Sequence, residues 1–580
     1  MRYSSNLNHL YTHTISTYIR MHFIEEFSSM SLTLIVSFVT LILYIWLRRN
    51  WQRFGWDSSK PLPPGPKKLP FFGNSFDMPS THQWITFSKW ADQFDSDILH
   101  LKVAGGDYIV LSSYKASTDL LDKRSGIYSS RPHVTMIQDL WDGDLLFLPY
   151  GESLHAHRKL FHQEFHPTNS SLHRPHEKKA TIVFLNNLTD TPEEWLKHIE
   201  HLTGTTILAV AYGIHVQPKD DPNIAAVEKM ISVFKAAAMP GAFLVDVFPI
   251  LKYIPSWFPG ASFKQKAKAW RGIFQETITP PFMHVKQAMA SFHYYGYLTY
   301  SKYPRKKKPI QQVNGTAEDC FSLRCLQKVK NPDPRPDHLS EEEEIIKETV
   351  GTMYEGGADT GITALRTFLL AMMCFPETQQ EAQEELDCVV GRERLPDYND
   401  LDESLLPYVS AIVIECFRWQ PIVPLAFPHQ SVAEDTYKGY YIPKGSIVVP
   451  NVWRILQDEK MYGPNTDVFN PKRWLLPTSD IQQRGLGAVS RWKLNPDMPD
   501  PMLVSFGFGR RVCPGKHMGL SSFTMNVATL LYSFNITPPM GKDGILIKPE
   551  IKYVSVPLYL LNAPSNLVQK TMLQLSDRHY

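Results

Sequence analysis

The chain has 580 residues, of which 43% are hydrophobic and 20% are charged, a composition typical of a folded protein with a large core. Its net charge of +2 gives no reason to expect a nucleic-acid partner. Six cysteines are sparse for this length and form no C-x-x-C pair, which disfavours a disulfide framework and a structural zinc site. Length alone suggests several domains, but one large domain behind a membrane anchor fits equally well.

The N-terminal region predicts a single membrane anchor. Residues 1–30 are polar and without periodicity, and we expect a disordered extension there. Ser31–Leu47 is apolar and uncharged, and as a helix it would be about 25 Å long, at the lower limit for crossing a bilayer. Arg48 and Arg49 follow at once, which places the downstream chain in the cytoplasm. A cleaved signal peptide is the alternative, but no small-residue cleavage site follows the apolar run.

A linker is expected over residues 48–74, and it contains the proline-rich run Pro61–Pro66. Proline fixes φ and lacks a backbone donor, so this run should be stiff and extended. Its functional interpretation is a hinge that sets how the domain sits on the membrane, and the alternative is a plain spacer. The folded domain is expected over residues 75–565, with a C-terminal tail at 566–580.

The domain is predicted to be mainly α with a small β region. A capping box at Ser340–Glu343 opens a helix of well over 30 residues that ends near Phe375, before Pro376. Further helices are expected from about Glu377 to Val390 and from about Leu406 to Trp419. The β-prone runs are short: Asp97–Leu101, Tyr108–Leu111, Ser446–Val449 and Val554–Tyr559. Phe292–Val313 and Thr478–Ser490 are interpreted as insertions, either surface loops or untrimmed intron sequence.

The most specific motif is the run from Phe506 to Gly515, FGFGRRVCPG, which fits F-x-x-G-x-R-x-C-x-G at all five fixed positions. Chance would give this match in roughly one chain of this length per several thousand. A helix is expected to begin just after Cys513, and helix N-termini favour negative charge, so the sequence predicts a lowered thiol pKa. Glycines on both sides let backbone N–H groups approach the sulfur.

This run resembles the cysteine loop of the cytochrome P450 superfamily, and other segments from Pro61 to Pro564 match that superfamily in the same order. The resemblance implies the cytochrome P450 fold, haem b (iron protoporphyrin IX) as cofactor, Cys513 as the iron ligand and Phe506 beside the haem. Arg511 is expected to pair with a haem propionate. Thiolate ligation favours O–O cleavage.

The resemblance also assigns roles within the long helix, where Gly356, Gly357, Asp359 and Thr360 stand. Two glycines inside a helix cost about 1 kcal/mol each relative to alanine, which usually marks a distortion or a close approach. The resemblance implies a groove for dioxygen at the glycines. Asp359 and Thr360 would form the acid–alcohol pair that relays protons. Gly361 follows where many members of the superfamily carry threonine or serine.

Other matches concern cofactor binding and stability. Arg158 matches the arginine of the superfamily's W-x-x-x-R helix, but Leu154 stands where tryptophan is usual, so one propionate hydrogen bond should be missing. His155 or His157 are candidates to replace it. His429 resembles a position that meets a propionate. Structural, non-catalytic roles are expected for the E-x-x-R pair Glu415 and Arg418 and for the downstream Arg473.

The implied activity is a monooxygenase that inserts one atom of dioxygen into a lipophilic small molecule. Residues from Arg131 to Leu148, with Met136, Leu140, Trp141, Leu145 and Phe147, suggest an apolar substrate pocket. No flavin or nicotinamide motif is found, so electrons should come from NADPH through a separate reductase, with a cytochrome b-type protein as a further candidate donor. Arg158, Lys159, Arg510 and Lys516 are expected to form the docking face.

The sequence as a whole resembles fungal secondary-metabolite and xenobiotic hydroxylases, including those similar to O-methylsterigmatocystin oxidoreductase. The endoplasmic reticulum membrane is the expected location. The alternatives are a haem-thiolate isomerase or peroxygenase that uses no dioxygen, and a haem-binding protein without turnover.

Overall fold

A computed structural model describes residues 37, 40, 41 and 44, then 60–70, 72–140, 145–218, 220–238, 241–300 (side chains to 289), 318–335, 337–478, 491–540, 545–547, 549 and 572–575. The predicted extension, most of the anchor Ser31–Leu47 and residues 48–59 of the linker lie outside these ranges. So do the β-prone run Val554–Tyr559 and nearly all of the insertion Thr478–Ser490.

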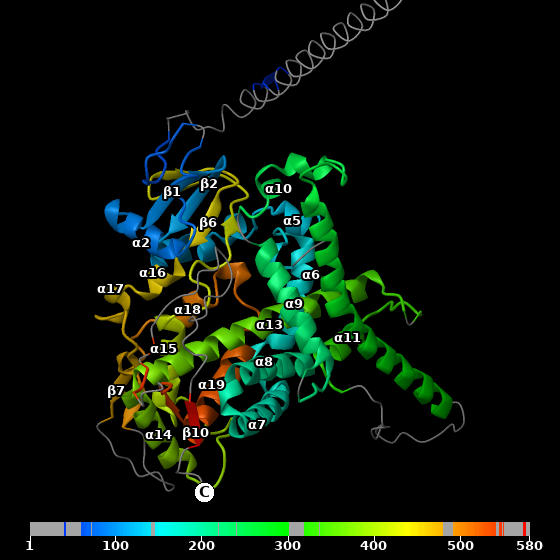
Figure 1. Ribbon diagram of the computed structural model, residues 1–580, viewed down its shortest axis with the longest axis vertical. Coiled ribbons are helices and arrows are strands. Elements are labelled where there is room, and N and C mark those ends of the chain that lie inside the picture. The colour runs from blue at the N-terminus through cyan, green and yellow to red at the C-terminus, as the bar shows by residue number, and fades with distance from the viewer. Residues whose placement is uncertain are drawn as a thin grey trace, which may run out of the picture.

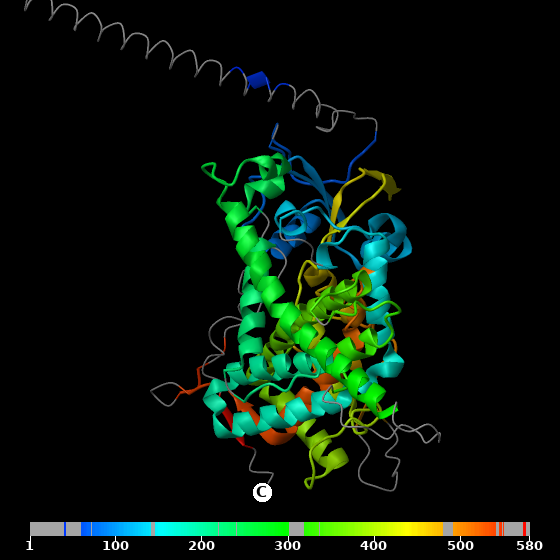
Figure 2. The same ribbon diagram turned by 90° about the vertical axis from the view of Figure 1, so that its right-hand side faces the viewer.

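Helices make up most of the described chain (Figures 1 and 2). They are α2 (Gln83–Gln93), α3 (Tyr114–Ser117), α4 (Ser125–Tyr128), α5 (Thr135–Gln138), α6 (Glu152–Phe165), α7 (Arg174–Asp190), α8 (Trp195–Tyr212), α9 (Pro222–Ala237), α10 (Leu244–Val247), α11 (Ser262–Tyr300), α12 (Phe321–Leu326), α13 (Glu341–Cys374), α14 (Pro376–Val390), α15 (Pro407–Trp419), α16 (Val452–Leu456), α17 (Glu459–Tyr462), α18 (Met502–Ser505) and α19 (Lys516–Ser533). A π-helical turn covers Thr118–Lys123, and 3₁₀ turns include Leu145–Phe147, Pro167–Leu172, Pro192–Glu194, Pro249–Tyr253, Pro471–Trp474 and Gly509–Arg511.

Strands form one small sheet and three two-stranded pairs. They are β1 (Ile98–Val103), β2 (Gly106–Leu111), β3 (His429–Gln430), β4 (Asp435–Tyr437), β5 (Tyr440–Ile442), β6 (Ile447–Pro450), β7 (Leu475–Pro477), β8 (Trp492–Leu494), β9 (Phe534–Thr537) and β10 (Met572–Leu575). The four-stranded sheet has the order β1-β2-β6-β3, in which β2 and β6 run parallel. The predicted fold class, mainly helical with a small β region, is confirmed, as are the three β-prone runs that the structure describes.

Helix α13 organises the core. Its 34 residues begin at the predicted capping box, in which Ser340 and Glu343 bond reciprocally, and end before Pro376 as expected. The helix packs against α6, α8, α9, α11, α12, α15 and α19, so residues far apart in the chain meet along its length. A residue on α13 is therefore placed by the whole core.

The proline-rich run belongs to the folded domain. The carbonyl oxygen of Pro64 accepts from the backbone N–H of His100 at 2.9 Å, and that of Pro61 accepts from Tyr441 at 2.7 Å. Asn74, at the end of the predicted linker, is fully buried. These contacts hold Pro61 and Pro64 to the folded domain, which contradicts a free hinge at these prolines.

Two other expectations need correction. The expected loop Phe292–Val313 is helical as far as Tyr300, because it prolongs α11 and so needs no nucleation of its own; residues 301–317 are outside the described chain. Residues 572–575 were assigned to a tail, but they form β10 and pair with β9.

Of the predicted anchor, Ser37, Thr40, Leu41 and Tyr44 are described, and they are helical. Within the described ranges, no single helix is both long and apolar enough to cross a membrane, and the one pair that passes together, α13 with α14, is bent by 105°.

Candidate functional site

The cysteine loop joins α18 to α19 and is held by its own backbone. The N–H of Cys513 donates to the carbonyl oxygen of Phe506 at 2.8 Å, and the N–H of Arg511 donates to that of Phe508 at 3.1 Å. Gly509 has φ +52°, and a Cβ there would lie 2.2 Å from the carbonyl oxygen of Leu121. A side chain at 509 would therefore displace the loop, which explains this fixed glycine of the motif.

Cys513 is a free cysteine within this loop. The residue is exposed, although so much protein surrounds it that burial raises the pKa of its thiol. The N–H of Gly515 and the charges of Arg158 and Lys516 oppose this effect without overcoming it. The predicted lowering of the pKa is thus wrong for the protein alone, and a bound metal ion would have to supply the remaining stabilisation of the thiolate.

Two arginines flank this cysteine without an acidic partner. Arg158 of α6 donates to the carbonyl oxygen of Val512 at 2.8 Å, and Arg511 donates to those of Ser129 at 2.8 Å and Leu148 at 2.5 Å. Burial and the nearby Arg158 lower the pKa of Arg511 to about 10. Among the described residues neither arginine forms an ion pair. Both arginines are half-buried, and partly desolvated cations without counter-charges are unfavourable, so this place favours an anionic ligand.

On α13, Gly356 and Thr360 lie on one face of the helix. Gly356 is exposed although its helix runs through the core, and a Cβ there would meet nothing within 4 Å. Thr360 donates from Oγ1 to the carbonyl oxygen of Gly356 at 2.9 Å. The Thr360 oxygen is thereby left as an acceptor beside the open position.

Gly357 does not share this face. A Cβ there would come within 2.4 Å of Cδ1 of Ile207 in α8. The absence of a side chain at Gly357 thus allows α8 to approach α13 closely, and its expected place in a dioxygen groove stays a prediction.

Asp359 pairs with a lysine that the sequence did not suggest. Its Oδ2 lies 2.6 Å from Nζ of Lys235 in α9, and both side chains are largely covered. Glu200 of α8 and Arg366 of α13 lie close enough to act on this cluster electrostatically. No sequence signal could have revealed the pair, because the two residues lie on different helices 124 positions apart.

The two histidines that are candidates to replace the missing tryptophan lie in different surroundings. His157 is buried and its Nδ1 lies 2.7 Å from Oγ1 of Thr349 on α13, while burial lowers the pKa of His157 to about 4. His155 is exposed and meets the ring of Tyr150 edge to face, with centroids 4.9 Å apart. Leu154 itself is buried as part of the packing of α6.

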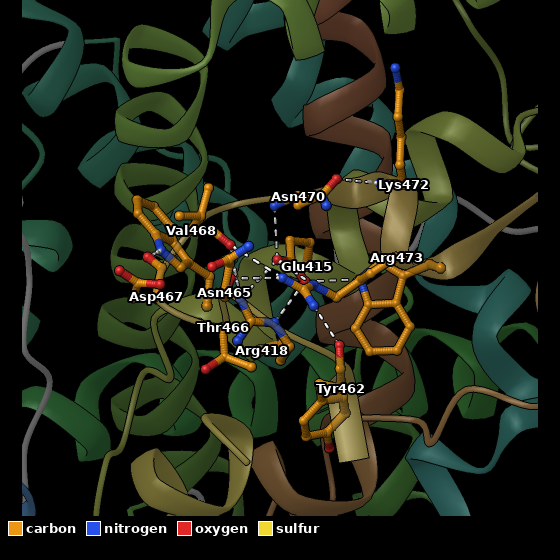
Figure 3. A network of polar contacts seen from close by, with 12 residues as sticks. Glu415, Arg418, Tyr462, Asn465, Thr466, Asp467, Val468, Asn470, Lys472 and Arg473 are labelled. Atoms are coloured by element: carbon orange, nitrogen blue, oxygen red, sulfur yellow. Dashed lines mark hydrogen bonds and ion pairs between the residues drawn. The ribbon is translucent and has the colours of Figure 1, made fainter. Parts of the chain in front are cut away.

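Glu415 is the centre of a buried network, as Figure 3 shows. Its carboxylate accepts two bonds of 2.8 Å from Arg418 and one of 3.1 Å from Arg473. Trp474 Nε1 and the backbone N–H of Asn470 each donate to it at 2.9 Å. Two of these contacts lie within α15 and the other three tie α15 to the segment 470–474, and none of the five faces open space, so the predicted structural role of Glu415, Arg418 and Arg473 is confirmed.

The residues of the predicted substrate loop lie in different surroundings. Met136 is fully buried among Val245, Phe263 and other apolar residues, so it contributes to the core rather than lining a pocket. Phe147 packs against Phe234 of α9 with ring centroids 6.0 Å apart. Trp141 lies outside the described residues, and Leu140 and Leu145 are partly buried against these clusters.

Comparison with known proteins assigns the family. The cytochrome P450 family profile matches residues 63–560. The chain belongs to the cytochrome P450 family. It is 37% identical to cytochrome P450 monooxygenase ple1 of Rhodocybe pseudopiperita, over 85% of this chain and 86% of that protein. It is 39% identical to tryptamine 4-monooxygenase of Psilocybe cyanescens, over 83% and 88%. It is 38% identical to a monooxygenase of Coprinopsis cinerea, over 85% and 86%.

This P450 is accordingly a haem-thiolate monooxygenase whose cofactor is haem b. The described residues fit that group. Cys513 offers an accessible sulfur, and the unpaired cations of Arg158 and Arg511 suit the two carboxylates of a haem.

His429 fits less simply than the sequence suggested. Its Nδ1 lies 2.7 Å from the carbonyl oxygen of Tyr128, which can only accept, so Nδ1 carries the proton. Burial, with Arg131 and Arg511 nearby, holds the pKa of His429 well below its usual value. The neutral ring then offers Nε2 as an acceptor, and it would need a second proton to donate to a propionate.

Proposed function

We propose that this P450 inserts one atom of dioxygen into a lipophilic small molecule, with Cys513 as the iron ligand and electrons from NADPH delivered by a separate reductase. The observation that carries the proposal is an accessible thiol beside two half-buried arginines that form no ion pair among the described residues, together with an open position at Gly356 on the central helix. The haem, when bound to the thiolate, supplies reductive activation of dioxygen. Three relatives of the same family, which align with this chain over most of their length, are named as monooxygenases and support the reaction class.

The chain's own residues would position the haem and carry protons to the site where oxygen binds. Arg158 and Arg511 would neutralise the propionates and so fix the orientation of the haem above Cys513. Thr360 would accept a hydrogen bond from a water through the free lone pair of its hydroxyl, and that water would in turn donate toward the oxygen site. Asp359 would carry protons toward Thr360, and it would have to exchange its contact with Lys235 to do so.

We also propose a single-pass anchor at Ser31–Leu47 in the endoplasmic reticulum membrane, with the domain in the cytoplasm. The reductase would dock where Lys159, Arg510 and Lys516 lie on the side of the cysteine loop. Arg158 does not belong to that surface, because its guanidinium points inward to Val512.

The docking surface is tested by charge reversal. Lys159→Glu combined with Lys516→Glu should lower reductase-supported NADPH consumption at low salt, and added salt should narrow the difference from wild type. Lys197→Glu, an exposed lysine on α8, is the matched control. Unchanged turnover of the double variant at low salt would refute this docking site.

The propionate role is tested through haem retention rather than turnover. Arg158→Leu removes one half-buried cation without adding a polar group, so we expect faster loss of haem to an apomyoglobin acceptor. Equal rates of loss for wild type and variant would show that Arg158 does not hold the cofactor.

The haem-thiolate isomerase or peroxygenase remains the second candidate. Product formation that is independent of NADPH and dioxygen would favour it.

A further inference from the structure

A cavity of 730 Å³ lies between the first turns of α14 and α15 and the segment 462–473. Its volume falls within the roughly 300–1,000 Å³ of pockets that bind small molecules in other proteins. None of the residues that line it belongs to the site around Cys513, Arg158 and Arg511. The function proposed above therefore gives this cavity no role.

The walls of the cavity are held by contacts that need no ligand. Glu415 accepts from the backbone N–H of Asn470 at 2.9 Å and from Nε of Arg473 at 3.1 Å, which fixes that wall on α15 (Figure 3). Glu385 of α14 accepts from the backbone N–H of Tyr408 at 2.9 Å, which fixes the first turn of α15 on α14. A ligand would therefore meet a preformed cavity, so little ordering of the protein would oppose binding.

Most of the lining is apolar. Phe375, Phe469 and Met498 contribute to it, and the ring centroids of Phe375 and Phe469 lie 5.8 Å apart. Val468, which also lines the cavity, is 40% exposed. An aromatic or aliphatic ligand would exchange water for contact with these side chains, and aromatic rings also attract cations to their faces.

The charges of the lining leave one carboxylate without a counter-charge. Nζ of Lys472 lies 2.6 Å from Oε1 of Glu381, and Arg473 pairs with Glu415. Glu377, in the first turn of α14, forms no ion pair within the part of the chain that the structure describes. Three acids thus stand against two bases at the cavity, and this excess favours a cation.

The phenol of Tyr408 experiences the same excess of negative charge. Burial raises the pKa of Tyr408, and the nearby Glu381 raises it further. Glu377 and Glu385 act in the same direction from farther along α14. Acidic side chains of one helix therefore act together on the space beside Tyr408.

We propose that this cavity binds an organic cation, an ammonium group on an aromatic or aliphatic body, with Glu377 as its counter-charge. The body of the ligand would lie against Phe375, Phe469 and Met498, and the ammonium group would lie beside Glu377. The ligand need not be the substrate, because the cavity is separate from the haem site. The inference does not depend on the proposed reaction, since no lining residue takes part in it.

The test is equilibrium dialysis of benzyltrimethylammonium against the full haem-loaded chain in a non-ionic detergent. The quaternary nitrogen has no lone pair, so this probe cannot ligate the haem iron. We expect saturable binding at a single site, with a Kd on the order of millimolar or lower, and an unchanged Soret band. Binding that does not saturate would refute a defined site. A shifted Soret band would place the probe at the haem and refute the separate cavity.

Charge variants identify the counter-charge. Glu377→Gln should weaken binding about fivefold, the effect of losing one partly exposed ion pair. Glu384→Gln, which removes an exposed acid of the same helix outside the lining, should leave the Kd unchanged. Lys472→Met frees Glu381 and should tighten binding, whereas Lys460→Met, at an exposed lysine outside the lining, should not. Equal effects of Glu377→Gln and Glu384→Gln would overturn the assignment of the counter-charge.

Two further measurements test the cavity and its preference for a cation. Val468→Trp should fill the cavity and abolish binding, while its melting temperature and haem content without the probe show that the fold is retained. Undiminished binding by folded Val468→Trp would place the probe elsewhere and refute the proposal. Benzyl alcohol, an uncharged aromatic competitor, should displace the probe only weakly. Displacement at concentrations near the Kd of the probe would show a purely apolar pocket and overturn the organic cation as ligand.

Discussion

Replacing Glu415 by glutamine should reveal how much of the fold depends on the network in Figure 3. Glu415, Arg418 and Arg473 are buried, and the carboxylate accepts five hydrogen bonds. Breaking a buried ion pair costs about 3–5 kcal/mol, because a charge is left uncompensated. Glutamine keeps the shape of the glutamate side chain and one acceptor oxygen, but its NH₂ group replaces the other oxygen and faces N–H groups that can only donate. We expect a loss of about 3–5 kcal/mol, a large part of the roughly 5–15 kcal/mol of a typical domain.

The assay is the denaturant midpoint of the detergent-solubilised chain, followed by tryptophan fluorescence. Lys197→Ala is the matched control, because the Lys197–Glu194 pair is exposed and such pairs are worth about 1 kcal/mol or less. Glu415→Ala should be worse than glutamine and fail to accumulate as folded protein. A midpoint for Glu415→Gln equal to that of Lys197→Ala would refute the reasoning, since the network would then contribute no more than an exposed pair.

Two further predictions concern pH and helix packing. Burial lowers the pKa of His157 from 6.5 to about 4, so on acidification the unfolded chain binds this proton before the folded chain does. The contribution of His157 to the free energy of unfolding should therefore be complete above about pH 6.5 and be lost toward pH 4. The loss from this group is at most about 3 kcal/mol. His157→Gln, which can still bond Thr349, should flatten the change in melting temperature between pH 7.5 and pH 5; an unchanged slope would contradict the assignment. Gly357→Ala should lower the melting temperature, because overpacking against Ile207 costs about 1–3 kcal/mol, whereas Gly356→Ala should raise it through about 1 kcal/mol of helix propensity. Equal effects of the two alanines would show that the glycines face the same surroundings.

The sequence predicted those features that depend on neighbouring residues. The capping box at Ser340 and the proline after Cys374 determine the ends of α13 locally, and both ends were found where expected. The cysteine loop is equally local, since its glycines, its arginine and its cysteine lie within ten residues. The buried role of Glu415 could be assigned because the resemblance supplied a distant partner, Arg473.

Features that depend on tertiary packing were missed. The neighbour that Gly357 packs against is Ile207 of another helix, and the ion-pair partner of Asp359 comes from α9. The pKa of Cys513 was predicted from a helix N-terminus alone, but burial by the whole domain outweighs that local effect. Met136 is an apolar residue of the kind that lines pockets, and only its packing against α10 and α11 shows that it belongs to the core.

The most direct test of the central claim is the carbon monoxide difference spectrum of the reduced, membrane-expressed protein, measured beside Cys513→Ala. If Cys513 is the iron ligand, the wild type should show the Soret band of a thiolate-ligated haem, and the variant should lack it. A thiolate band that survives in Cys513→Ala would contradict the assignment of the ligand. A wild type whose only band is of the thiol or imidazole type would contradict an active haem-thiolate site and favour the haem-binding protein without turnover.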